Sequence, residues 1–222
     1  MSEKQESILL TVFTDPMMGL SYESQPILDR LEREFAGRLS IRYVMSVLVR
    51  DVSDFMTPEE AALEPEEGIR RYCRRLAEIY KSEIPIGNLP MNMEDLRLFD
   101  PEHRSSRPLC LAVKAAELTD PAMAAEYLKA LRRATVLESR PTTHMKEIWR
   151  VARETGLDEE VFLSHLEDGS AQQALGEDLA FTRRMGVTGL PSYLISSGNR
   201  TLMFRSFRYE DFLRAVRQVS EK

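Results

Sequence analysis

Short apolar runs and amphipathic stretches alternate over the first fifty residues. Residues 8–13 are apolar and rich in β-formers, which predicts a buried strand. The segment from about Tyr22 to Phe35 repeats apolar residues at helical spacing, and Gly37 follows it as a C-terminal cap would. Residues 39–47 have the alternation of a second strand. Strand, helix and strand in this order predict a parallel pair with a crossover helix.

The middle of the chain has a helical period, with no convincing strand from Thr57 to about His165. Thr57 is followed by Pro58 and by an acid three residues on, which predicts a capped helix start. Residues 81–108 contain several prolines and are predicted to be a loop. Helices are predicted over 67–80, 110–117, 121–137, 143–154 and 158–166.

The last fifty residues return to mixed structure. Ser170 is predicted to cap a helix that runs to about Met185, and a glycine-rich turn then leads to Pro191. Residues 197–199 have the composition of a hairpin turn. Strands are predicted over 192–195 and 201–204, and a final amphipathic helix over 209–219.

A parallel unit at one end and a hairpin at the other can share one mixed sheet. The sequence therefore predicts an α/β fold in which residues 5–55 and 170–220 form one domain. Residues 56–169 are expected to be an all-helical subdomain inserted into a loop, where insertions cost little free energy.

The chain is acidic, with a formal net charge of −6 and a pI near 5.3. No basic field would steer it to phosphates, so nucleic acid is not expected as a partner. No stretch approaches the ~20 apolar residues of a membrane helix. Residues 1–7 are polar and show no signal-peptide pattern. We expect a cytoplasmic protein that does not bind membranes.

Cysteine and histidine are sparse. Cys73 and Cys110 lie in apolar or amphipathic helical segments outside any CxxC motif, as buried core thiols do. Arginines flank Cys73, which keeps single-thiol chemistry open. His103, His144 and His165 are scattered without metal-ligand spacing, so no metal site is expected.

Two local motifs stand out against this background. Phe13 to Tyr22 follows the first strand and contains Asp15-Pro16, and Gly186 to Tyr193 contains Gly189-Leu190-Pro191 before a hairpin. Together with the element order, they resemble the DsbA-like branch of the thioredoxin superfamily, above all its FrnE-like members. The first matches aromatic-x-Asp-Pro-x-Cys-x-x-Cys-aromatic, and the second matches the cis-proline loop. The resemblance covers nearly the whole chain and implies a thioredoxin-like fold with a helical insertion.

The chain departs from that family at its reactive residues. Matched residue by residue, Met18 replaces the exposed cysteine and Ser21 the resolving cysteine. Disulfide exchange needs a thiolate, which neither a thioether nor a serine hydroxyl provides. The resemblance therefore implies an oxidoreductase fold without dithiol chemistry at this site. From the residues alone, packing for Met18 and helix capping for Ser21 remain open.

The resemblance places a binding site between this turn and the proline loop. It implies that Pro191 is cis and that the backbone of Leu190 is free to pair with an extended peptide or with glutathione. Asp15 is expected to shape the turn. The expected binding residues are Asp15, Met17, Met18, Leu20, Ser21, Tyr22, Gly189, Leu190 and Pro191.

Three functions stay open, because a fold does not by itself imply an activity. The first is a peptide- or protein-binding module, since the resemblance includes adaptors of cytosolic proteases and methionines accommodate varied partners. The second is a glutathione-dependent transferase or isomerase related to the kappa-class enzymes, which have serine where this chain has Met18. The third is a single-thiol oxidoreductase that uses Cys73 or Cys110. Glutathione is the one cofactor expected to be possible, and a homodimer stays open.

Overall fold

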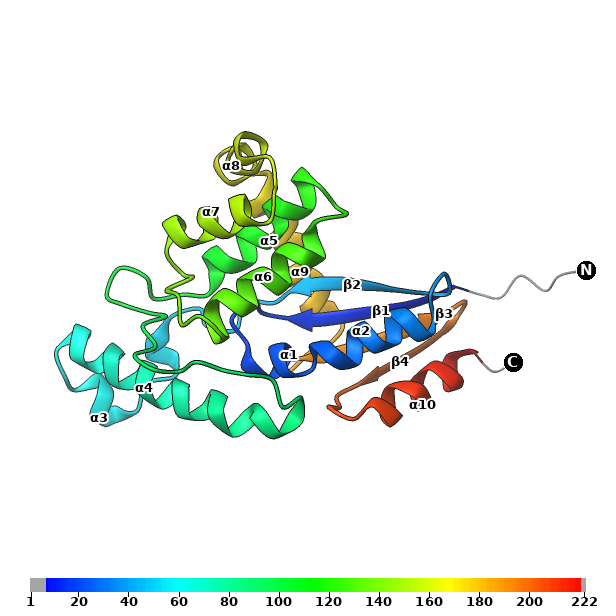
Figure 1. The fold of residues 1–222 in the computed structure, drawn as a ribbon, viewed down its shortest axis with the longest axis horizontal. Coiled ribbons are helices and arrows are strands. Elements are labelled where there is room, and N and C mark those ends of the chain that lie inside the picture. The colour runs from blue at the N-terminus through cyan, green and yellow to red at the C-terminus, as the bar shows by residue number, and fades with distance from the viewer. Residues whose placement is uncertain (1–6, 221–222) are drawn as a thin grey trace, which may run out of the picture.

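A mixed four-stranded sheet with strand order β2-β1-β3-β4 organises the computed structural model, which describes residues 7–220 (Figure 1). Residues 1–6, which include the start of the predicted 5–55 segment and most of the polar N-terminus, lie outside the described residues. The strands are β1 (Ile8–Thr14), β2 (Leu39–Met45), β3 (Ser192–Ser197) and β4 (Arg200–Phe204). As predicted, β1 and β2 are parallel, and β3 is antiparallel to both β1 and β4.

Helices cover both faces of the sheet. On one face, α2 (Gln25–Glu34) and α10 (Tyr209–Ser220) pack their apolar stripes on the strands. The two helices bury the apolar side chains of the sheet on this face, to which half of each strand's side chains project. On the other face, α9 (Ser170–Arg184) places Phe181 on Phe13, with ring centroids 5.5 Å apart. The predicted α/β fold class with a mixed sheet is confirmed.

The segment between β2 and α9 is helical, and it stands at the ends of β1 and β2 to which the strand arrows point (Figure 1). Thr57 and Glu60 form the reciprocal capping box expected at the start of α3. No helix among residues 7–220 has the length and apolar character that a membrane crossing requires. The helices are α3 (Pro58–Ala61), α4 (Pro65–Glu83), α5 (Arg107–Thr119), α6 (Ala124–Val136), α7 (Met145–Glu154) and α8 (Glu159–Glu167), with 3-10 turns at Val52–Asp54 and Ile84–Ile86.

Two predicted helix starts are wrong. The expected helix from Tyr22 to Phe35 is two helices, α1 (Gly19–Glu23) and α2, separated at Ser24. Ser170 is the first residue of α9, and Gly169, with a φ of 88°, occupies the cap position. Gly169 serves there because positive φ costs a glycine little.

The division at residues 56 and 169 stays a prediction. The largest hydrophobic cluster includes side chains of the helical segment and of α9, from which Ala171 and Leu175 contribute. It also includes Met17 and Tyr22 from residues 15–22 after β1, which contain Met18 and Ser21 and form the altered turn. The helices between β2 and α9 are therefore packed into the same core that supports the turn, which ties the geometry of the turn to that segment.

Candidate functional site

Asp15 directly follows β1 and is completely buried. Its Oδ1 accepts a hydrogen bond from the Met17 backbone N–H at 3.1 Å. Its Oδ2 accepts from the Leu48 backbone N–H at 2.8 Å and from the Ser106 hydroxyl at 2.6 Å. Burial raises the pKa of Asp15, and these donors oppose the rise. Asp15 therefore joins the turn to the segment after β2 and to the residue that precedes α5.

Met18 and Ser21, which stand at the two dithiol positions, are both buried. Met18 precedes the first residue of α1, and its side chain is 6% exposed. The Ser21 hydroxyl lies 2.8 Å from the Thr14 hydroxyl and 3.9 Å from the Met18 sulfur. Ser21 is therefore not the helix cap that the sequence left open, since α1 begins at Gly19 and the Ser21 side chain is bonded internally.

A buried arginine closes the inner side of this network. Arg132 of α6 donates from Nη2 to the Thr14 hydroxyl at 2.8 Å and from Nη1 to the Gln25 side-chain oxygen at 2.9 Å. Desolvation lowers the pKa of Arg132. Ser21 thus faces a polar network shared with Thr14 and Arg132.

The outer side of the turn is covered by the end of α4. The Tyr80 hydroxyl donates to the Met17 carbonyl, and a Cβ added to Gly19 would overlap the Glu83 carboxylate. Beyond α4, Glu23 of α1 accepts hydrogen bonds from the Gly87 and Leu89 backbone N–H groups at 2.9 and 3.2 Å. The segment from Tyr80 to Leu89 therefore lies directly on α1.

This cover determines where the expected lining residues lie. Met17 and Tyr22 pack into the core of the helical segment, and the Tyr22 hydroxyl donates to the Pro90 carbonyl at 2.9 Å. Leu20 is partly exposed. Met18 is almost completely buried and offers little surface to an occupant of the turn, whereas Leu20 is partly accessible.

The carboxylates of Glu83 in α4 and Glu23 in α1 lie near each other where the two helices are in contact. Burial, and then the charge of Glu23, raise the pKa of Glu83 to about 7. Burial also raises the pKa of Glu23. One oxygen of each, Glu23 Oε1 and Glu83 Oε2, is buried without a hydrogen-bond partner among the described residues. Ionising both carboxylates is therefore unfavourable, because like charges repel in a site with little water.

The proline loop lies at the same edge of the sheet as the turn, because Phe13 near the end of β1 pairs with Ser192 at the start of β3. The Leu190–Pro191 peptide bond is cis. Leu190 is partly exposed, and within residues 7–220 nothing hydrogen-bonds to its backbone N–H or C=O. A cavity of about 250 Å³ adjoins the loop, between the residues after β2 and the end of α9.

Arginines surround this free backbone. Arg50 and Arg183 line the cavity and are exposed. Arg205 lies close to Gly189, since a Cβ added there would stand 2.6 Å from Arg205 Nη1 and the arginine side chain would have to move. An extended chain on Leu190 would meet positive charge on several sides.

The cysteines are not placed as nucleophiles. Cys73 and Cys110 are free thiols with 1% and 0% exposure. Burial raises the pKa of each, and for Cys110 the carboxylate of Asp15 adds to the rise. Both thiols are thus held protonated at neutral pH, which disfavours a single-thiol oxidoreductase.

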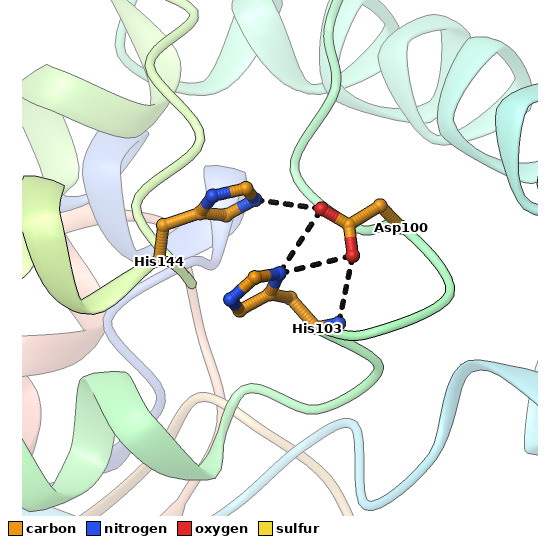
Figure 2. Close-up of side chains that lie close together, drawn as sticks. All are labelled: Asp100, His103 and His144. Atoms are coloured by element: carbon orange, nitrogen blue, oxygen red, sulfur yellow. Dashed lines mark hydrogen bonds and ion pairs between the residues drawn. The ribbon is translucent and has the colours of Figure 1, made fainter.

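The structure brings together two of the histidines that the sequence left scattered. The rings of His103 and His144 are stacked with centroids 3.7 Å apart, and both contact Asp100 (Figure 2). The sequence shows no metal-ligand spacing among the histidines, and this cluster was not expected from it. Asp100 lies three residues before His103, so those two are close in the chain, but no sequence signal connects either of them with His144.

These features define a thioredoxin-fold protein in which methionine and serine occupy the dithiol positions. The family model described as Thioredoxin matches residues 11–202, and the chain belongs to that family.

The chain is also similar to curated proteins over most of its length. The chain is 25% identical over 89% of its length to the ClpXP adapter protein SpxH of Halalkalibacterium halodurans, and 28% identical over 84% to SpxH of Shouchella clausii. It spans 61% and 57% of those relatives' lengths.

Among solved structures, the cytosolic disulfide reductase DsbM of Pseudomonas aeruginosa is 20% identical, with a TM-score of 0.68 over 95% of this chain and 98% of DsbM. A Nitrosomonas europaea protein described as a protein disulfide isomerase is 16% identical, with a TM-score of 0.76 over 98% of this chain and all of that protein. At these identities, the likeness to both structures shows the fold alone.

Replacing Asp15 should lower the free energy of unfolding. Asp15→Ala leaves the Met17 and Leu48 N–H groups and the Ser106 hydroxyl without their acceptor, and unsatisfied buried donors are expensive. We expect the free energy of unfolding in urea to fall by about 3 kcal/mol. Asp54→Ala, at an exposed aspartate, is the control. A loss no larger than that of the control would contradict the role assigned to Asp15.

Glu83 should make stability depend on pH. Its folded pKa of about 7 lies above the ordinary 4.5, so the folded state binds the proton more tightly. The stability that the protonated Glu83 contributes is complete below pH 4.5 and is lost as pH rises through 7, with solvent screening reducing the size of the loss. Urea unfolding of Glu83→Gln, which cannot ionise, should show a smaller decline over this window. Parallel pH profiles for the two proteins would contradict the assignment.

Proposed function

We propose that this chain is an adaptor-like protein that holds an extended segment of a partner polypeptide on the Gly189–Pro191 loop and performs no dithiol–disulfide exchange. The observation that carries the proposal is the free backbone of Leu190 beside a cavity, on a fold whose reactive cysteines are replaced by Met18 and Ser21. Adding a strand to exposed backbone is a general mode of peptide recognition, and it needs no cysteine.

The relatives support an adaptor more than an enzyme. SpxH is described as a ClpXP adapter, a protein that acts by binding other proteins. Since the chain spans only about three fifths of SpxH, its own partners are a matter of proposal. The two free thiols fit a reducing compartment, so we infer a cytoplasmic location.

The charges near the loop favour an acidic partner segment. Arg50, Arg183 and Arg205 offer guanidinium groups, which bind carboxylates in bidentate fashion. We therefore propose an extended peptide that pairs with Leu190 and carries Asp or Glu on its flanks. The partly exposed Leu20, on the neighbouring turn, is a candidate apolar contact for such a peptide.

Peptide binding should depend on this positive charge. Selection from a peptide array should yield acidic peptides. Measured by fluorescence polarisation, Arg205→Glu and Arg50→Glu should each bind a selected peptide about tenfold more weakly than the wild type, a loss of ~1.4 kcal/mol in binding free energy. Arg217→Glu makes the same charge change on α10 and should leave binding unaltered. Adding the chain to reconstituted ClpXP should then accelerate degradation of a protein that carries the selected peptide.

Two results would count against this proposal. One is a selection that returns no peptide, or only basic ones. The other is an equal loss of binding in Arg217→Glu, which would mean that peptide binding depends on the net charge of the protein and not on the arginines at the loop.

Glutathione is a second candidate ligand for the same loop, because it is a short peptide with two carboxylates. A calorimetric titration with reduced glutathione separates the candidates. Binding that displaces the selected peptide and weakens in Arg205→Glu would favour a glutathione-dependent transferase or isomerase. In this conformation Ser21 is not free to hydrogen-bond a glutathione thiolate, since its hydroxyl contacts Thr14 and Met18.

Disulfide reductase activity should be absent. In an insulin-reduction assay with dithiothreitol, the chain should give the rate of the reductant alone, and Cys73→Ser and Cys110→Ser should not change it, because both thiols are buried and protonated. Catalysis that survives both replacements would show a redox centre that uses neither cysteine.

A further inference from the structure

Asp100, His103 and His144 lie together although they come from two separate connecting segments. Asp100 and His103 belong to the long segment between α4 and α5, and His144 is the residue that precedes α7. His103 Nδ1 lies 3.0 Å from both carboxylate oxygens of Asp100, and His144 Nε2 lies 2.8 Å from Oδ2 (Figure 2). Both imidazoles therefore direct a nitrogen at one carboxylate.

We propose that Asp100, His103 and His144 form a binding site for one divalent transition-metal ion of the Zn²⁺ class. Two imidazoles and a carboxylate are the donor set that such ions take in open sites with three protein ligands. One ligand atom from each residue lies within 4.8 Å of the other two. The site is separate from the altered turn and the proline loop and does not depend on the proposed adaptor function.

The nitrogen and oxygen atoms of the cluster lie close to the spacing that a bound ion would need. Zinc binds imidazole nitrogen and carboxylate oxygen at about 2.0–2.1 Å, so two ligand atoms of a tetrahedral site are roughly 3.3 Å apart. The nitrogen–oxygen distances of 2.8 and 3.0 Å are hydrogen-bond distances, a few tenths of an ångström shorter. The two rings, inclined by 16°, must tilt apart to direct both nitrogens at one ion. The rings can move in this way because His103 and His144 are 31% and 32% exposed.

Backbone groups orient the carboxylate for this role. The N–H groups of Glu102 and His103 each donate to Asp100 Oδ1 at 2.8 Å. Oδ2 accepts from neither, so it is the oxygen available for the ion. A hydrogen-bonded carboxylate of this kind fixes ligand direction, as supporting shells do in metal sites.

A cavity gives the ion an open position. Asp100 and His144 line a cavity of about 270 Å³, together with Cys73, Glu66 and Arg70. A water molecule or an anionic group of a ligand could complete the coordination from this side. Bound metal would also join the segment before α5 to the segment before α7, in addition to the hydrogen bonds of the Thr143 hydroxyl to the Leu98 carbonyl and of the Ser139 hydroxyl to the Asn92 carbonyl.

Metal titration tests the site directly. Tag-free protein, treated with a chelator and dialysed, is titrated with Zn²⁺ by calorimetry and with Co²⁺ by visible absorption. We expect one ion per chain with a Kd of about 1 µM or tighter, and a Co²⁺ spectrum of the intensity that four-coordinate sites give. His103→Ala, His144→Ala and Asp100→Asn should each weaken binding by at least about tenfold. His165→Ala is the matched control, because His165 contacts Ser170 away from the cluster and should not alter binding.

Two outcomes overturn the proposal. The first is no Zn²⁺ binding at about 100 µM, which would leave the cluster a hydrogen-bonded pair of rings. The second is binding that survives in both His103→Ala and His144→Ala or is lost in His165→Ala. Circular dichroism of each metal-free variant identifies any that fails to fold. In that case, the Co²⁺-loaded wild-type chain is used instead, and its paramagnetic NMR spectrum must show shifted imidazole N–H signals from two histidines.

Discussion

The buried carboxylate of Asp15 is the interaction on which the site depends. It sits where β1 ends, and its partners come from the turn, from the segment after β2 and from the start of α5. Burial disfavours its charge, and donors from these three segments offset the cost only when all are in place. The carboxylate therefore couples the sheet to the helical segment, and the conformation of the turn follows from that coupling.

The helical segment then decides what the turn can do. Tyr80 and Glu83 at the end of α4 lie on α1, so the position that an attacking cysteine would occupy is covered. Arg132 and Thr14 engage Ser21 from within. Loss of the thiols and closure of the site are consistent with each other, because a nucleophile needs access and a thioether in a core needs none.

The proline loop shows the opposite character. It pairs closely with β1 through Ser192, yet Leu190 keeps an accessible and unpaired backbone next to a cavity with exposed arginines. The unpaired backbone and the covered turn thus lie at the same end of the sheet. The proposed adaptor function rests on this combination.

The sequence by itself determined the strands, the hairpin, the Thr57 capping box and the altered positions Met18 and Ser21, because local patterning and motif spacing encode these features. Three features were decided only by the tertiary structure: the burial of Met17 and Tyr22 in the core of the helical segment, the bonding of Ser21 to Thr14, and the meeting of His103 with His144. Each joins residues whose own neighbours in the chain carry no sign of the partner. The contacts of Tyr22 and of the two histidines arise from the path of the segments between α4 and α7, and that path is set by packing across the whole core.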